Sequence, residues 1–138
     1  MKVSKQVSAL APSSAASATV RMPGPGEVFP AACPSRVVLD HVTSKWGVLV
    51  LVALTDRTLR WGELRRTVPG ISEKMLAQTL RTLEADGFVH RDAQPVIPPR
   101  VDYSLTDRGT ELVTLLLPLF GWVVANAEEI VGERGPAA

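Results

Sequence analysis

The sequence predicts a mainly helical α+β domain in which a helix-turn-helix is followed by a β-hairpin. Two short helical patterns flank a Val-Pro-Gly-Ile turn at 68–71, and a proline-glycine pair of this kind ends a helix in a tight turn. Behind the second helix, two alternating, strand-like segments at 88–91 and 101–105 flank a proline-rich loop, which is the pattern of a hairpin with a stiff tip. With further apolar helices on either side, the predicted fold is a winged helix-turn-helix with N- and C-terminal helices.

The helices before the turn are assigned from their caps and their apolar residues. Pro34 suits the first position of a short helix that continues through residues 36–42. Thr43 or Ser44 can cap a second helix over residues 45–54, whose apolar residues run nearly all round it. A helix that is apolar on every side is a buried one. Its expected core residues are Trp46, Leu49, Val50 and Leu54.

The helix-turn-helix begins with a helix from Trp61 to Val68, which the Pro-Gly pair at 69–70 ends. Ser72 is a good N-cap for the next helix, which runs from Glu73 to about Asp86. Gly87 supplies the C-terminal stop of that helix. The two helices are therefore separated by a turn of only a few residues.

One face of the second of these helices is polar and cationic. With successive residues placed about 100° apart, Lys74, Gln78 and Arg81 lie opposite an apolar stripe. The stripe consists of Leu76, Leu80 and Leu83. Most polar helix faces are simply solvated, but a helix between a tight turn and a hairpin is the one that enters the major groove of DNA. Gln78 can then pair with adenine, and Arg81 or Lys74 with guanine.

Other polar residues around this helix are candidates for contacts with the DNA backbone. Ser72 and the helix N-terminus can meet a phosphate. Arg91 and Arg100, one on each limb of the hairpin, can enter a minor groove or neutralise phosphates. Arg65 and Arg66 on the preceding helix can reach backbone phosphates. The alternative for all four arginines is that they only keep an exposed surface soluble.

The charge of the chain supports a nucleic-acid partner only weakly. Its 138 residues carry 15 Lys and Arg against 14 Asp and Glu, a formal net charge of +1. Between residues 57 and 100, eight basic residues stand against five acidic ones, so the basic excess is local. The hairpin and the helix before it form the mildly basic part of a neutral chain.

The sequence also argues against several other classes of protein. The single cysteine excludes an intramolecular disulfide, and no continuous run reaches the roughly 18 apolar residues of a membrane span. Residues 1–20 are too polar for a signal peptide, so we expect a cytoplasmic protein with no membrane partner. His41 and His90 have no cysteine or carboxylate at metal spacing. With no catalytic triad or phosphate loop, we expect no enzyme, metal or cofactor.

The length fits one folded domain with less ordered ends. Residues 1–31 are rich in Ser, Ala, Pro and Gly, and we expect a disordered or loosely ordered arm. Residues 32–131 should form the winged helix-turn-helix domain, and residues 132–138 a flexible tail.

The last helix predicts a dimer. Thr106 or Asp107 can cap a helix that continues to about Ile130, and Pro118 inside it should kink or split it. Its apolar residues offer more surface than one small domain can cover, and a partner helix would remove it from water at about 25 cal/mol per Å². The alternative is a helix that packs only on its own domain. The residues concerned are Leu112, Leu115, Leu116, Leu119, Phe120, Trp122 and Val123.

Cys33 is a candidate redox or electrophile sensor. It directly precedes Pro34 at a predicted helix start, where the helix dipole and free N–H groups favour a thiolate. A reactive, exposed thiol is what such a sensor needs. The alternative is a cysteine that only fills the cap or packs at a dimer interface. Since no second cysteine exists in the chain, any disulfide would join two subunits or a small thiol.

Several short motifs in this order resemble the HxlR-type winged-helix regulators, over roughly residues 33–125. The resemblance implies a dimeric bacterial transcription regulator, related in fold to MarR-type proteins, with dimer contacts from the first and last helices. It also implies sensing through Cys33, because some members sense oxidants, quinones or aldehydes there. Trp61 stands where the family more often has Phe, and Pro118 departs from the family's last helix. The matching motifs are Cys33-Pro34, Lys45-Trp46, Trp61 to Leu64, Pro69 to Ser72, Leu76, Leu80-Arg81, Leu83-Glu84, Gly87, Pro98 to Val101, Tyr103 to Thr106, Gly109 and Trp122.

The sequence thus predicts a homodimer that binds double-stranded DNA at a short inverted repeat and represses by occupying a promoter. Two alternatives stay open. A winged helix can instead serve as a protein-interaction module, which the weak net charge permits. The dimer interface could also bind a small apolar effector near Trp46 and Trp122.

Overall fold

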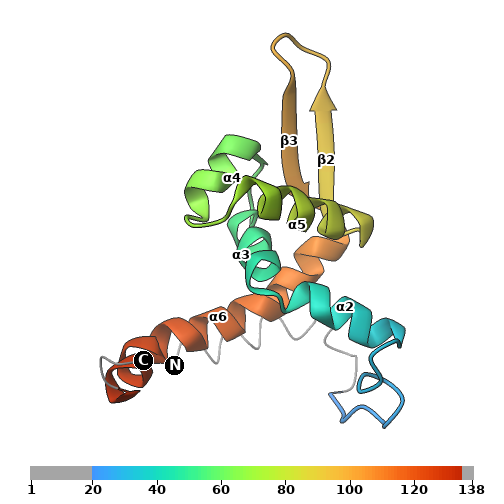
Figure 1. The fold of residues 1–138 in the computed structure, drawn as a ribbon, viewed down its shortest axis with the longest axis vertical. Coiled ribbons are helices and arrows are strands. Elements are labelled where there is room, and N and C mark those ends of the chain that lie inside the picture. Colours follow the sequence, from blue (N-terminus) through green and yellow to red (C-terminus); the bar gives the residue numbers. More distant parts are fainter. Residues whose placement is uncertain (1–19, 135–138) are drawn as a thin grey trace. The chain divides into compact units, whose positions relative to one another are not determined.

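The computed structural model describes residues 20–134 (Figure 1). The chain divides into two compact units, residues 1–37 and 38–138. The elements are α2 (Pro34–Val42), α3 (Lys45–Ala53), β1 (Leu59–Arg60), α4 (Trp61–Thr67), α5 (Glu73–Ala85), β2 (Val89–Gln94), β3 (Arg100–Leu105) and α6 (Asp107–Arg134).

The core of the second unit forms around α3, as the apolar sequence of this helix predicts. Val50 and Leu54 are buried, whereas Trp46 and Leu49, also expected in the core, are half-buried against it. Ser44 caps the helix by accepting a hydrogen bond from the Gly47 backbone N–H at 3.1 Å. Leucines from α4 and α5 and the base of the hairpin complete the core. They include Leu64, Leu76, Leu80, Leu83, Val89 and Tyr103.

A three-stranded antiparallel sheet in the order β1-β3-β2 carries the wing. The hairpin of β2 and β3 projects beyond the helices in Figure 1. β1 was not predicted, because two residues are too few for an alternating pattern to register. Its Leu59 pairs with Tyr103 of β3, and both side chains are buried. This pairing fixes the foot of the wing to the start of α4.

The turn between α4 and α5 has the predicted caps. Ser72 accepts a hydrogen bond from the Met75 backbone N–H at 3.0 Å, which satisfies one of the free donors at the start of α5. Gly70 before α5 and Gly87 after it both have positive φ, at 92° and 82°, a region that glycine enters without strain.

α6 continues through Pro118 without interruption, so of the two predicted effects of this residue, a kink or a split, the split does not occur. Proline removes one hydrogen bond, but the turns on either side of it hold the helix together. Gly109, Val113 and Leu116 are buried before Pro118, whereas none of the helix residues from 119 to 134 is buried. By length and composition alone α6 could cross a membrane, but its first half belongs to the core of the winged helix.

The first unit is described from residue 20, so most of the expected N-terminal arm lies outside the described residues. Residues 25–33 form turns and bends. Arg21 forms an ion pair with Glu27 at 2.9 Å, and this guanidinium, with the Gly24 backbone N–H, lowers the pKa of the Glu27 carboxyl. The Arg36 guanidinium donates to the Phe29 carbonyl at 2.7 Å. The segment before α2 is thus held by local polar contacts.

Candidate nucleic-acid interface

The exposed face of α5 presents the predicted row of polar side chains. Lys74, Gln78 and Arg81 are exposed, while the leucine stripe on the opposite face is buried. None of the three has a hydrogen bond or ion pair with any residue between 20 and 134. Ala85 continues the row one turn beyond Arg81 and is also exposed. Its methyl group could contact a thymine methyl, and its helical spacing from Arg81 was the signal that would have revealed it.

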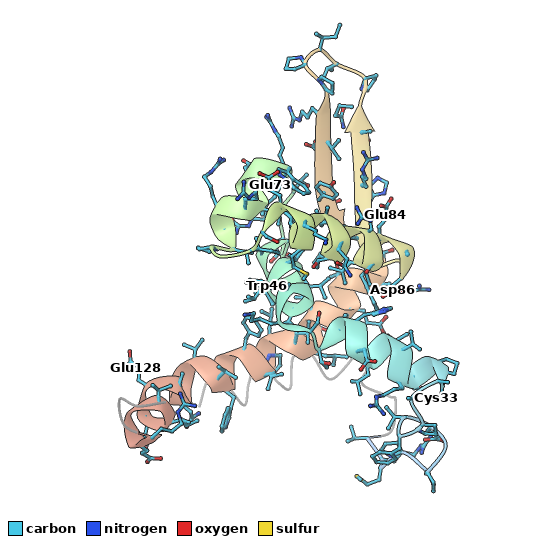
Figure 2. The ribbon with its side chains drawn as sticks, viewed as in Figure 1. Cys33, Trp46, Glu73, Glu84, Asp86 and Glu128 are labelled. Carbon is cyan, nitrogen blue, oxygen red and sulfur yellow. The ribbon has the colours of Figure 1, made fainter. Side chains whose placement is uncertain are left out.

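The acidic side chain at the N-terminus of α5 is paired with an arginine of α4. The Arg65 guanidinium lies 3.3 Å from the Glu73 carboxylate, so α4 and α5 are joined by an ion pair at the end that would face a phosphate (Figure 2). Both side chains are well exposed, so the pair contributes little to stability. Arg66 has no such partner among the described residues. Of the two α4 arginines, only Arg66 has no ion-pair partner among the described residues.

The two wing arginines lie on opposite faces of the hairpin. The register pairs Arg91 with Tyr103 and Arg100 with Gln94. Paired residues share a face and successive residues alternate, so Arg91 shares the face of the buried Tyr103 and Arg100 lies on the other. Arg100 is at the tip, and Arg91 is three pairs nearer the base. The sequence placed both near the tip, but only the register distinguishes their faces.

Two aspartates balance the charge of the wing. Asp92 and Asp102 are direct cross-strand partners, an arrangement that is unfavourable unless each carboxylate finds a donor. Arg100 donates to Asp102 at 3.0 Å, and the Gln94 amide donates to Asp92 at 2.7 Å. Arg100 is therefore held locally, whereas Arg91 has no partner among residues 20–134.

The C-terminal end of α5 is anchored to two other helices through Asp86, its C-cap. Its carboxylate lies 2.7 Å from Nδ1 of His41 on α2, and its backbone carbonyl accepts a hydrogen bond from Arg108 of α6 at 2.8 Å. These contacts set the direction in which α5 presents its exposed row. No sequence pattern indicated them, because the three residues lie far apart in the chain.

The remaining predicted residues belong neither to the exposed row of α5 nor to the wing. Cys33 is half-buried directly before α2, and its thiol donates to the Glu27 carbonyl at 3.5 Å. Trp46 is half-buried on α3 beneath the Lys45 ammonium, 4.3 Å from the ring centroid. Trp122 is 60% exposed on the distal half of α6. Among the described residues, no group of three His, Cys, Asp or Glu side chains could hold a metal.

The sequence from 41 to 131 matches the model of the HxlR-like helix-turn-helix family. The chain belongs to this family. The HxlR-like chain is 50% identical to the HTH-type transcriptional regulator YtfH of Escherichia coli over 113 residues, which cover 82% of this chain and 90% of the relative. It therefore belongs to a class of transcriptional regulators related to MarR-type winged helices, which are generally not enzymes.

Several solved structures of regulators, including HypR in both oxidized and reduced forms, are similar to the HxlR-like chain. A putative transcriptional regulator, ytfH from Salmonella typhimurium, is 50% identical, with a TM-score of 0.72 and coverage of 78% of this chain and 96% of the other. The redox regulator HypR in its oxidized form is 41% identical, with a TM-score of 0.62 and coverage of 68% and 97%. The wing and helix-turn-helix described above are therefore those of a helix-turn-helix transcriptional regulator.

Proposed function

We propose that this protein is a cytoplasmic homodimer that binds an inverted-repeat operator and represses transcription by occupying the promoter. The observation that carries the proposal is the row on α5, in which Lys74, Gln78 and Arg81 are exposed and have no partner among the described residues. A helix in this position of a winged helix-turn-helix enters the major groove. Because these side chains have no partner among the described residues, they would lose no contact within that part of the chain when they bind a base edge.

The backbone of the DNA would be held on both sides of α5. Ser72 and Arg66 lie at the N-terminal side, and Arg91 lies on the face of the wing that is continuous with the core. Arg65 and Arg100 are paired with Glu73 and Asp102. They would have to leave these exposed partners to meet a phosphate, so we assign them weaker contacts.

Dimerisation is favoured by the apolar surface that α2 and the distal half of α6 leave exposed. Trp122 and Leu119 are 60% and 57% exposed, and Val124 is 76% exposed. Apolar side chains gathered on one helix at this exposure are typical of an interface. A two-fold dimer would present two α5 helices to half-sites about one helical turn apart.

Cys33 is our proposed oxidant sensor. It stands at the start of α2 and is only half-buried, and two of the similar solved structures are of a redox regulator, in oxidized and reduced forms. Oxidation would join Cys33 to a small thiol or to the cysteine of the second subunit, because the chain has one cysteine. Operator binding that falls on treatment with diamide in the native protein, but not in Cys33→Ser, would support the sensor. An equal fall in both would remove Cys33 from that role.

The base-reading role is tested by Arg81→Ala, on an operator selected from random DNA and on a scrambled duplex. We expect about a 10- to 100-fold loss of affinity for the operator, because a bidentate contact with a base contributes about 1–3 kcal/mol of discrimination. Fluorescence anisotropy at fixed salt measures both affinities. The matched control is Arg134→Ala, which removes the same charge from the end of α6. An equal loss of affinity for both duplexes would exclude Arg81 from base reading.

The wing arginines are tested through the salt dependence of binding. Arg91→Ala should lower the slope of log affinity against log salt by about 1, because one phosphate contact is lost. Arg100→Ala should change the slope less, since Arg100 is paired with Asp102. Equal slopes in both variants would contradict this assignment of the two faces.

A further inference from the structure

A cavity of about 190 Å³ lies within the second unit, between the end of α2, the start of α3 and the inner side of α5. This volume is below the roughly 300–1,000 Å³ of pockets that hold drug-sized ligands, so it suits a molecule the size of a small fragment. More than half of the lining residues come from α5. They are Met75, Gln78, Thr79, Thr82 and Leu83, with Asp40, His41, Ser44 and Gly47 opposite.

The cavity contains polar groups without partners. Thr79 is the only buried polar residue between residues 20 and 134, at 8% exposure, and its hydroxyl has no hydrogen-bond partner among them. The side chains of Thr82 and Gln78 also have none in this part of the chain. The one fully buried side-chain oxygen without a partner in this part of the chain is Thr55 Oγ1. The Thr79 hydroxyl, although its residue is buried, is therefore open to water or to a ligand in the cavity that it lines.

The other polar groups of the cavity are occupied. Ser44 donates to the His41 carbonyl at 3.0 Å and accepts from Gly47. Nδ1 of His41 is bonded to Asp86, and when Nδ1 carries the proton, the second ring nitrogen is an acceptor. The groups available to a ligand are thus two threonine hydroxyls, one amide and one imidazole nitrogen.

The charge around the cavity does not favour anions. No lysine or arginine lines it, whereas Asp40, which has a partner of its own, does, and a second carboxylate, Asp86, lies behind His41. A carboxylate or phosphate would lose its hydration without gaining a cationic partner. A primary amine would instead donate to the hydroxyl and amide oxygens and be attracted by the nearby acidic groups. The methyl and methylene groups of Met75 and Leu83 provide apolar contact for the rest of such a molecule.

We propose that this cavity is a binding site for a small amine, and that the amine acts as an effector of DNA binding. The site differs from the interface near Trp46 and Trp122, since neither residue lines it. Gln78 both lines the cavity and belongs to the exposed row of α5. An amine that holds the Gln78 amide would withdraw it from a base edge. This effector role rests on the proposed function, whereas the binding site does not.

Binding can be measured without DNA because Met75 is a natural reporter. The chain has three methionines, Met1, Met22 and Met75, and only Met75 lies in the second unit. With ¹³C-methyl methionine, benzylamine should produce a saturable shift of the Met75 methyl signal and leave the other two unchanged. Benzoate, which has a similar size and the opposite charge, should produce none. No saturable shift with benzylamine, or an equal one with benzoate, would overturn the proposed site.

Thr79→Val separates a ligand contact from a structural role. It retains the shape of the side chain, so the free energy of unfolding should stay equal or rise, while benzylamine affinity should fall about tenfold with the loss of a hydrogen bond. Thr82→Leu should fill the cavity and abolish the shift, whereas Thr110→Leu on the exposed part of α6 should not. Unchanged affinity in both Thr79→Val and Thr82→Leu would place binding elsewhere and overturn the site.

The effector role is then tested by anisotropy on the selected operator with and without benzylamine. Affinity should fall in the native protein and stay constant in Thr82→Leu. If the native protein binds benzylamine and the operator independently, the effector role is wrong and the site remains. If no operator can be selected, the proposed function fails while the site is still decided by the Met75 signal.

Discussion

Both halves of α6 are rich in apolar residues, but they have opposite environments. Before Pro118, Gly109, Val113 and Leu116 are buried in the winged helix. After it, Trp122 and the other apolar residues remain exposed. One helix thus belongs at one end to the core of its own chain and at the other to an exposed apolar surface, for which we propose a second copy of the chain as the partner. Apolar composition indicates that a helix will be covered, but not what covers it.

The largest effect should come from Gly109→Ala in the buried half. A Cβ atom at this position would lie 2.1 Å from the Phe88 carbonyl oxygen, and neither backbone can move without opening the core. We expect the free energy of unfolding to fall by about 3 kcal/mol or more, measured by urea denaturation.

Gly121→Ala is the matched control in the exposed half. Its Cβ would meet nothing within 4 Å, so helix propensity should raise stability by about 1 kcal/mol. A loss of stability at Gly121 would instead indicate close approach of a second copy there. If Gly109→Ala leaves the free energy of unfolding unchanged, the two halves of α6 do not differ in burial as described.

Pro118→Ala addresses the boundary between the two halves. The substitution restores a backbone N–H that can donate to the Thr114 carbonyl, and it should raise the free energy of unfolding by up to about 3 kcal/mol. Thermal unfolding at one protein concentration measures the gain. If stability falls, Pro118 itself makes a favourable contact in the dimer, and the boundary is part of the interface.

Trp122→Ser should act on association, with little effect on folding. A buried tryptophan at an interface commonly contributes about 2 kcal/mol, so the dissociation constant should rise about 30-fold. Sedimentation equilibrium gives this constant, and circular dichroism checks the fold. Ile97→Ser, which removes a fully exposed apolar side chain from the wing tip, is the control. If both substitutions leave association unchanged, the distal half of α6 is not the dimer interface.

Much of the fold could be predicted because local signals agreed with it. The Ser72 cap, the positive-φ glycines and the leucine stripe of α5 are properties of short segments, and each is found where the sequence indicated. β1 was missed because its two residues act only through their pairing with β3. Pro118 does not split α6, because its local effect is outweighed by the helical turns on both sides of it.

Each residue of the candidate site could be predicted from the sequence, but the contacts between these residues could not. Helical periodicity separated Arg81 from the leucine stripe, and the alternating strands located Arg91 and Arg100. Periodicity could not indicate that Arg100 is paired with Asp102 while Arg91 is not. The cavity was also invisible in the sequence, since Thr79 looked like an ordinary helical threonine. Such relations depend on register and packing between segments that are distant in the chain.

Asp86 couples α5 to the helices that do not touch DNA in the proposed complex. The C-terminal end of α5 is tied through this residue to α2 and α6, while its N-terminal end is held by Leu76 in the core and by an exposed ion pair with α4. A shift of α2 or α6 would therefore reach α5 first at its C-terminal end, next to Arg81 and Ala85. In a dimer of the proposed kind, such a shift would change the spacing between the two α5 helices.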